Sequence, residues 1–505
     1  MGKTVIAMIT IIIMTKILGF SRDIFLSYFY GASEITDAYL IAMTIPTVFF
    51  TFIGLGIAAG YIPSYTKIVE QQGEAAAQQF TSNLVNLTIL LTTGIVVVLM
   101  VFPVFFIKMF AFGFEGETLK LAVRFMQIAS LSMYFTALIY IFNSFLEIQG
   151  KYLITVLAGI PLNLVMILFI YLSSVWNIYL LAIGSIISVA IQFMFVIPAI
   201  RKTGFRYKFY FSLKEESLKK MILLSLPVII GVSVDQINVL VDRTIASQIV
   251  EGGISALTYA NRINFFIEAI FVTAVVTVVF PKIAKMAVKK EMVQLKWMIQ
   301  KLITTVALLM IPATVGLMIF SKEITALLFG RGAFDANALA MTSGVLFFYS
   351  IGMIGFGLRE VISKVFYSLE DSKTPMINAI GAMVLNVILN IVLSRLMGIS
   401  GLALATSIAA LTSVFFLYRS LLKKIGSIET KVLVLDISKA LIASLLMGIG
   451  AKTVYLALGE NTASLFAAVT VGVIIYGSLL IILRVNDVSY YKERLLVFRR
   501  KQLEN

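Results

Sequence analysis

The chain has 505 residues, of which 60% are hydrophobic and 13% are charged, whereas soluble globular domains carry about 25% charged residues. It contains neither cysteine nor histidine, which excludes a disulfide framework, a thiol nucleophile and the commonest metal ligand. The net charge of +15 is interpreted as a membrane-topology signal and not as a sign of nucleic-acid binding.

Apolar stretches long enough to cross a bilayer, about 20 residues each, recur along the whole sequence. They predict an all-α polytopic membrane protein with about fourteen transmembrane helices. The expected spans are 4–29, 36–62, 81–107, 121–146, 152–173, 177–200, 221–247, 255–281, 302–321, 338–366, 374–394, 398–418, 432–456 and 462–483. The loops between them are too short for a catalytic domain, so we expect no enzyme activity and no metal centre.

Lysine and arginine collect in alternate loops. They are dense in the 201–220 loop, in the 282–301 loop and in the tail that ends with Arg499, Arg500 and Lys501. Because cytoplasmic loops accumulate these residues, the pattern predicts that both termini are cytoplasmic.

Parts of the sequence repeat. Pro161-Leu-Asn-Leu-Val resembles Val384-Leu-Asn-Val-Ile, so that Asn163 and Asn386 occupy matching positions. Six helices per copy is an even number, which predicts a parallel repeat of the kind that transporters use. We therefore expect an N-lobe at 1–210, a C-lobe at 211–425, and two extra helices with the basic tail at 426–505.

The first span carries Lys16, Arg22 and Asp23, although a charge at membrane depth costs roughly 2.5–3.5 kcal/mol. Lys16, Gly19 and Asp23 share one helix face, and Arg22 lies about 100° round from it. Such charges usually line a substrate path. The alternative is an internal pair, Arg22 with Asp23 or Lys16 with Asp23, that serves structure only.

The eighth span places Asn261, Asn264 and Glu268 along one stripe with Arg262 beside it. Arginine suits phosphate because its planar fork donates two hydrogen bonds and stays charged. Arg22 and Arg262 could therefore hold a diphosphate between the two lobes. The alternative is that backbone carbonyls or Glu268 satisfy Arg262.

In the seventh span, Asp235 and Asp242 lie one seven-residue step apart on the same face. They could hold Na⁺ or a proton as a coupling ion, or could neutralise Arg243, and the sequence does not decide between these roles. Asp37 opens the second span, where an acid stabilises a helix N-terminus; a role in the cavity is equally open.

A further pair of charges lies in the tenth span. Glu360 and Lys364 are spaced i,i+4, a spacing that predicts a salt bridge along the helix.

Three segments resemble the MurJ (MviN) family of bacterial flippases for lipid II, the lipid-linked peptidoglycan precursor. They are Thr15-Lys-Ile-Leu-Gly-Phe-Ser-Arg-Asp, Gly31-Ala-Ser-Glu-Ile-Thr-Asp-Ala-Tyr and Tyr259-Ala-Asn-Arg. The resemblance implies the MOP exporter fold, with two lobes around a cationic cavity and a groove for the polyprenyl tail at the last two helices. The family's cavity residues match Lys16, Arg22, Asp23, Asp37 and Arg262, and a family sodium-site carboxylate falls at Asp242.

The sequence also departs from the family pattern. Many members carry an arginine pair and Glu-Gly where this chain reads Phe49-Phe-Thr-Phe-Ile-Gly-Leu-Gly, and a family acid is Phe265 here. The resemblance implies a monomeric lipid II flippase of the bacterial plasma membrane with no cofactor, apart from Na⁺ as a coupling ion. The alternatives are an exporter of another polyprenyl-diphosphate-linked glycan and a multidrug/cation antiporter.

Overall fold

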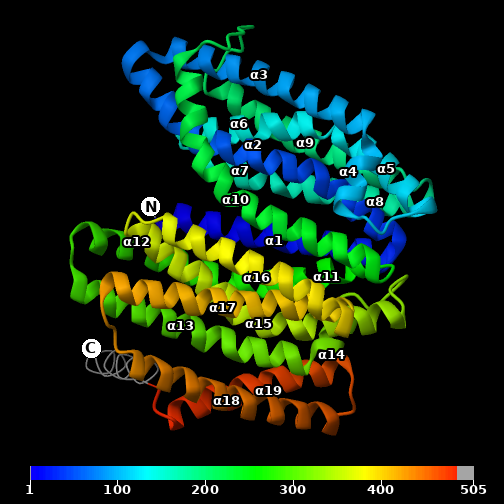
Figure 1. The fold of residues 1–505 in the computed structure, drawn as a ribbon, viewed down its shortest axis with the longest axis vertical. Coiled ribbons are helices and arrows are strands. Elements are labelled where there is room, and N and C mark those ends of the chain that lie inside the picture. Colours follow the sequence, from blue (N-terminus) through cyan, green and yellow to red (C-terminus); the bar gives the residue numbers. More distant parts are fainter. Residues whose placement is uncertain (1, 486–505) are drawn as a thin grey trace. The chain divides into compact units, whose positions relative to one another are not determined.

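The computed structural model describes residues 2–485, except for side chains at 2–9 and at some positions within 224–235 and 273–278. The C-terminal tail with Arg499, Arg500 and Lys501 therefore lies outside the described residues. Over 2–485 the chain is helical, without strands (Figure 1). The helices are α1 (Gly2–Tyr30), α2 (Glu34–Gln72), α3 (Glu74–Val101), α4 (Pro103–Phe110), α5 (Gly116–Ser130), α6 (Met133–Ile148), α7 (Tyr152–Leu157), α8 (Gly159–Val175), α9 (Leu180–Lys202), α10 (Glu216–Ile249), α11 (Gly253–Glu268), the π-helix η1 (Ala269–Thr273), α12 (Ala274–Val288), α13 (Met292–Ile319), α14 (Ser321–Leu328), α15 (Ala336–Ser368), α16 (Lys373–Met397), α17 (Ile399–Ile425), α18 (Thr430–Ala457) and α19 (Thr462–Ile482).

The expected all-α membrane architecture is confirmed. Among the described residues, ten helical segments are long and apolar enough to cross a membrane, and they number eleven if α5 and α6, which meet at a bend of 42°, count as one broken span. The remaining expected spans correspond to α1, α10 and α11–α12, which include undescribed side chains. The total of fourteen therefore stays a prediction.

The chain forms two compact units. The first unit comprises residues 1–255 and 331–338, and the second comprises 256–330 and 339–505. The first unit thus includes the whole of α10 and a short segment from much later in the chain. The lobe boundaries that were expected from the repeat remain a prediction.

Two short helices stand at matching places in the two halves. The eight-residue helix α4 follows α3 after a break at Phe102, and the eight-residue helix α14 follows α13 after a break at Phe320. Both break residues have a non-helical backbone, with φ near −117° and −109°. This shared irregularity agrees with duplication, although hydropathy alone gives no sign of it.

Glycines allow α10 to pack closely on α2 in the first unit. A Cβ on Gly60 would lie 2.6 Å from the backbone oxygen of Met221, and one on Gly56 would lie 3.3 Å from Cβ of Ser225. The Ser225 hydroxyl lies 2.5 Å from the carbonyl oxygen of Gly56. Small residues with such hydrogen bonds are how membrane helices associate, so this contact fixes α10 against α2.

The linker between α9 and α10 is held along α3. Asn83 donates to the carbonyl oxygen of Ser212 at 2.8 Å and accepts from the Ser212 N–H at 2.8 Å. Asn86 donates to the carbonyl oxygen of Tyr210 at 2.9 Å. The linker is therefore an ordered strap over the end of α3, since its backbone polar groups are paired with side chains.

The segment 331–338 joins the first unit at the end of α1. The N–H of Ala333 donates to the carbonyl oxygen of Tyr28 at 2.8 Å. Gly332 has a φ of +65°, and a Cβ there would lie 2.2 Å from that same oxygen. Gly31, with a φ of +63°, faces the backbone oxygen of Ala333 in the same way. Only glycine fits at both positions.

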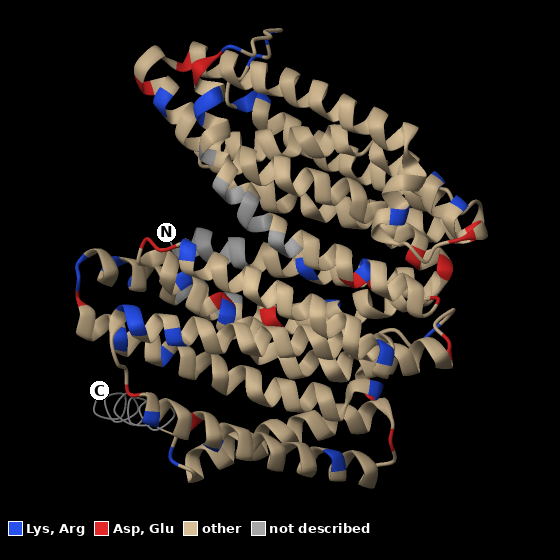
Figure 2. Ribbon diagram, in the orientation of Figure 1, with Lys and Arg blue, Asp and Glu red and all other residues tan. Residues whose placement is uncertain are grey.

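One end of the second unit gathers three turns, of which α12–α13 and α17–α18 are flanked by lysines and α15–α16 carries Glu370 and Asp371 (Figure 2). Lys424 at the end of α17 bonds Asp371 in the turn between α15 and α16, with 2.7 Å between Nζ and Oδ2. A Cβ on Gly426 would lie 3.0 Å from Nζ of Lys296, near the start of α13. These contacts place the turns α12–α13, α15–α16 and α17–α18 together.

Candidate functional site in the membrane-spanning helices

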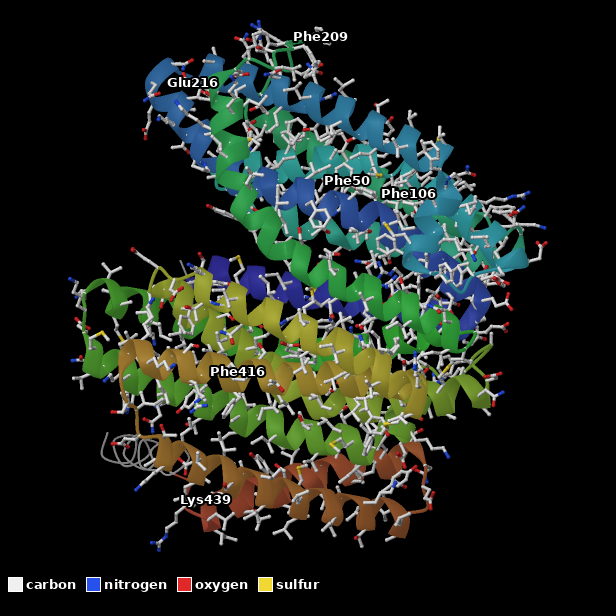
Figure 3. All side chains as sticks on the ribbon, viewed as in Figure 1. Phe50, Phe106, Phe209, Glu216, Phe416 and Lys439 are labelled. Atoms are coloured by element: carbon white, nitrogen blue, oxygen red, sulfur yellow. The ribbon has the colours of Figure 1, made fainter. Side chains whose placement is uncertain are left out.

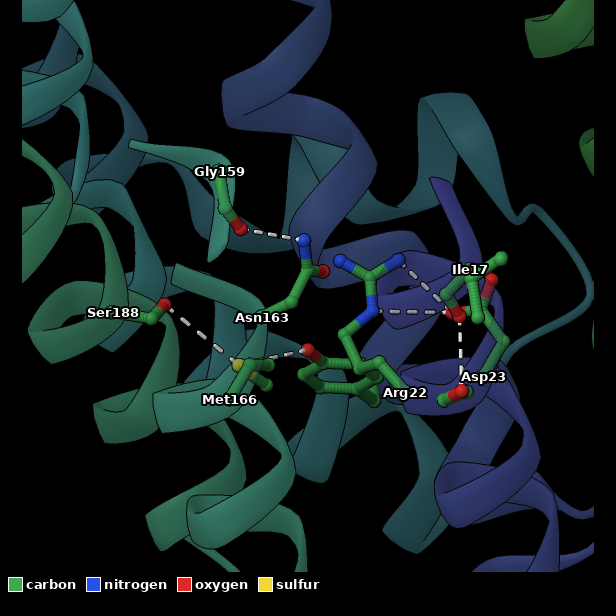
Figure 4. Close-up of polar contacts among 9 residues, drawn as sticks. Ile17, Arg22, Asp23, Gly159, Asn163, Met166 and Ser188 are labelled. Carbon is green, nitrogen blue, oxygen red and sulfur yellow. Dashed lines mark hydrogen bonds and ion pairs between the residues drawn. The ribbon is translucent and has the colours of Figure 1, made fainter. Parts of the chain in front are cut away.

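Arg22 and Asp23 form an ion pair within α1 (Figure 4). Nε and Nη2 of Arg22 lie 3.2 and 2.9 Å from Oδ1 of Asp23. The side chain of Asp23 is 10% exposed and that of Arg22 is 28% exposed. The pair that was considered as a structural alternative does form, yet it leaves part of the guanidinium accessible. Lys16 is exposed and makes no salt bridge within the described part of the chain.

Uncharged polar side chains of two other helices, α8 and α2, lie near this pair (Figure 4). Asn163 of α8 donates to the carbonyl oxygen of Gly159 at 2.8 Å, and its Oδ1 lies 3.6 Å from where a Cβ of Gly19 would be. Tyr39 of α2 points its hydroxyl to Sδ of Met166 at 4.0 Å. The first unit therefore holds Arg22 beside an amide and a phenol and not in an apolar environment.

Sequence reasoning did not place Asn163 or Tyr39 in the site. The only signal was the Leu-Asn pair shared by the two repeats, because it marked Asn163 as a polar residue in an apolar span. Gly159 helps to bring α8 near α1, since a Cβ there would lie 2.5 Å from Cγ2 of Thr15. This tight approach is what places Asn163 at Gly19.

Asp37 lies in the first turn of α2, as expected, and its carboxylate also bonds the first turn of α11. It is 2% exposed, and its Oδ1 accepts from the N–H and the hydroxyl of Ser255 at 2.7 and 2.6 Å. Ser255 lies in the first turn of α11, where an acid is favourable. Ser33 caps α2, because its hydroxyl accepts from the N–H of Thr36 at 3.4 Å.

In the second unit, the expected polar stripe runs along α11. Arg262 is exposed, whereas Asn261 and Glu268 are half-buried. Asn264 is 3% exposed, and neither of its amide atoms has a hydrogen-bond partner. Directly after Glu268 the helix continues as the π-helix η1, a distortion that is frequent at functional sites.

The charges of α15 extend this stripe. Glu268 lies close enough to Glu360 and Arg359 for electrostatic interaction. The expected salt bridge between Glu360 and Lys364 is absent from the ion pairs of the described residues. Nζ of Lys364 lies instead 5.9 Å from the ring centre of Phe280. The prediction failed because the i,i+4 rule ignores aromatic neighbours on a packed helix.

Arg243 of α10 bonds to α2. Its Nη1 donates to the carbonyl oxygen of Leu40 at 3.0 Å and also contacts the hydroxyl of Thr44. Asp242 has interactions of its own, and the side chain of Asp235 lies outside the described residues. The role of the two aspartates as an ion site therefore stays a prediction.

Comparison with known proteins gives a consistent picture. The family model for lipid II flippase MurJ matches residues 26–476. A probable lipid II flippase MurJ of Buchnera aphidicola is 29% identical over 425 residues, which are 83% of each chain. A probable lipid II flippase MurJ of Aquifex aeolicus is 29% identical over 480 residues, which are 94% of this chain and 93% of the relative.

Solved structures agree with these sequence relatives. A lipid II flippase MurJ in an inward closed conformation superposes with a TM-score of 0.83 at 27% identity, covering 95% of this chain and 99% of the other. An inward-facing multidrug resistance MATE family transporter of the MOP superfamily gives 0.70 at 14% identity, covering 83% of this chain and 98% of the other. The second likeness extends to the fold alone.

Proposed function

Because the chain belongs to the lipid II flippase MurJ family, we infer that it carries lipid II across the bacterial plasma membrane. We propose that it does so by alternating access, taking the diphosphate-sugar head group from the cytoplasmic leaflet and releasing it at the outer leaflet. Both termini are cytoplasmic in this proposal, in keeping with the lysines that flank two turns at one end of the second unit. The flippase works as a monomer and catalyses no chemical reaction.

In this proposal the head group is bound by Lys16, Arg22 and Asp23 and by Asn261, Arg262 and Glu268, whereas Asp37, also expected in this set, is buried against Ser255 and does not contact the ligand. The observation that supports this assignment best is the environment of Arg22. Asp23 occupies only one edge of the guanidinium, through Nε and Nη2, so Nη1 still has donors to offer a phosphate. A membrane-embedded arginine with a purely structural role is expected to have all its donors paired, because an exposed charge at membrane depth is costly.

The experiment is head-group translocation of fluorescent lipid II in proteoliposomes. A charged hydrogen bond contributes about 1.5–3 kcal/mol, so Arg22→Gln and Arg262→Gln should each lower transport by roughly 10-fold to 150-fold. Arg124→Gln is the matched control, because Arg124 is exposed and contacts only Tyr179 among the described residues. Full transport by both arginine variants would refute the proposed binding site while leaving the flippase function intact.

A second candidate substrate is another polyprenyl-diphosphate-linked glycan. The observation in its favour is that the chain has apolar residues at Phe49 and Phe265, where the family resemblance implies charge. The same liposomes loaded with such lipids would decide between them, because lipid II would then be transported poorly and the other glycan well.

We also propose that Na⁺ binds at Asp242 with Asp235 and drives the cycle. Binding of an ion can shift a conformational equilibrium only through different affinities in the two states. Transport should therefore depend on a sodium gradient in the wild type and lose that dependence in Asp242→Asn. A wild type that responds to membrane potential alone would refute sodium coupling.

A further inference from the structure

A large apolar groove lies within the first unit, separate from the polar residues around Arg22. Its volume is about 860 Å³, and its walls come from α2, α3 and α10, with Phe106 of α4 and Leu213 of the linker at its edges. Only two of its lining residues carry a hydroxyl, Thr88 and Ser225. Because Ser225 is bonded to the backbone of α2, the groove has little to offer a polar ligand.

The groove is long and follows the membrane-spanning direction. Its lining on α3 extends from Leu84 to Leu99, which corresponds to about 22 Å of helix at 1.5 Å per residue. The hydrocarbon core of a bilayer is about 30 Å thick. Figure 3 labels Phe106 and Glu216 toward opposite ends of this unit. These dimensions suit an extended hydrocarbon chain and not a compact molecule.

One side of the groove is open and the other is closed. Leu90 and Leu91 on α3 are more than half exposed, so the groove opens where a bilayer would surround α3. Its floor is closed by the contact of Gly56 and Gly60 with α10. An empty groove of this kind would leave its lining atoms without dispersion partners, and water would find too few polar groups there.

The end of the groove that Leu218 lines carries lysines together with Glu215, which Asn83 bonds, and Glu216. Lys220 bonds Glu216 at 2.5 Å, and Lys67 and Lys219 lie within electrostatic range of that same carboxylate. Lys67 and Lys219 are exposed. A phosphate is therefore the group complementary to these two lysines.

We propose that the groove binds a membrane phospholipid, with one acyl chain along α3 between α2 and α10 and the phosphate near Lys67 and Lys219. Phospholipid is favoured over a polyprenyl chain because it is the bulk component of the membrane, so mass action fills an open site with it. The bound chain completes the wall against which the first half of α10 packs. This site is independent of the head-group site and of the proposed function.

Gly94 provides the test, because it lines the groove and a Cβ there would meet nothing within 4 Å. Gly94→Phe should fill the groove without a clash. Gly381→Phe is the matched control, since Gly381 lies in α16, is not among the residues that line the groove, and is equally open. Gly94→Leu serves as a second variant if the phenylalanine impairs folding.

Delipidated protein is titrated with palmitoyl-oleoyl phosphatidylglycerol, and bound molecules are counted by native mass spectrometry. Wild type and Gly381→Phe should bind one molecule more than Gly94→Phe and Gly94→Leu. Lys219→Gln should weaken this molecule about fivefold, as expected for one lysine near a lipid phosphate. Equal binding by wild type and both Gly94 variants would overturn the proposal, as would a site that takes polyprenyl phosphate and excludes phosphatidylglycerol.

Discussion

The contact between Asp37 and Ser255 should be a measurable source of stability. Both donors of Ser255 converge on one carboxylate oxygen, at 2.7 and 2.6 Å, and the carboxylate is almost fully buried. Hydrogen bonds to charged groups contribute about 1.5–3 kcal/mol, against about 1 for neutral ones. An acid at a helix N-terminus adds about 0.3–1 kcal/mol, and up to about 2 when partly buried.

Asp37→Asn keeps the shape and one acceptor oxygen but removes the charge. We expect it to lower the free energy of unfolding by about 1–2 kcal/mol, because the cost of burying a carboxylate without a counter-charge offsets part of these gains. Ser255→Ala removes one donor only and should cost about 1 kcal/mol. Because the residues are in direct contact, the double variant should be less destabilised than the sum, with a coupling of about 1–2 kcal/mol.

The assay is equilibrium unfolding of the four proteins in mixed micelles, with Glu34→Gln as the control. Glu34 lies one turn before Asp37 on α2 and accepts from a neutral hydroxyl, that of Thr118, so its neutralisation should cost less than 1 kcal/mol. A coupling below about 0.3 kcal/mol, within the scatter of additive sites, would refute the view that Asp37 acts through Ser255.

Three further outcomes are expected. Gly332→Ala should destabilise the protein by more than 1 kcal/mol, since its φ is +65° and the new Cβ would meet a carbonyl oxygen of α1. The control Gly381→Ala should be neutral or stabilising in the same thermal unfolding experiment. Lys424 lowers the pKa of Asp371 to about 2 by donating a hydrogen bond to it. This pKa is below the unfolded value of about 3.9, so the stabilisation is present above pH 4 and is lost as pH falls from about 4 to 2. The melting temperature of Asp371→Asn should therefore fall less than that of the wild type over this pH range. Asn163→Leu should reduce lipid II transport more than tenfold while changing thermal stability little, and an unchanged rate would show that this amide does not help Arg22.

The sequence was sufficient to predict the helical membrane architecture, because runs of about 20 apolar residues leave few other structures in a bilayer. It did not predict the breaks at Phe102 and Phe320 or the bend between α5 and α6. Pro103 after Phe102 and the polar run from Ser321 after Phe320 mark both places in the sequence, but a hydropathy window passes over them. Breaks of this kind depend on packing against neighbouring helices.

The candidate site, too, could be predicted from the sequence only in part. The pairing of Arg22 with Asp23 was one of the alternatives that the sequence left open, and it forms because the long arginine side chain reaches back although successive helix positions lie about 100° apart. The neighbours Asn163 and Tyr39 were not, because they come from other helices and depend on how closely α8 and α2 approach α1. Asp37 lies at the N-terminus of α2 as expected, but its additional contact with the first turn of α11 could only come from the fold.

The discontinuous make-up of the first unit has a consequence for biogenesis. Residues 331–338 belong to it, and Ala333 pairs with the end of α1. During translation, residues 256–330 must be made first, which takes roughly 4–15 s at about 5–20 residues per second. For that interval the carbonyl oxygen of Tyr28 lacks its native partner. The nascent first unit is therefore incomplete well after its own helices are inserted, which gives membrane chaperones a defined period in which to bind it.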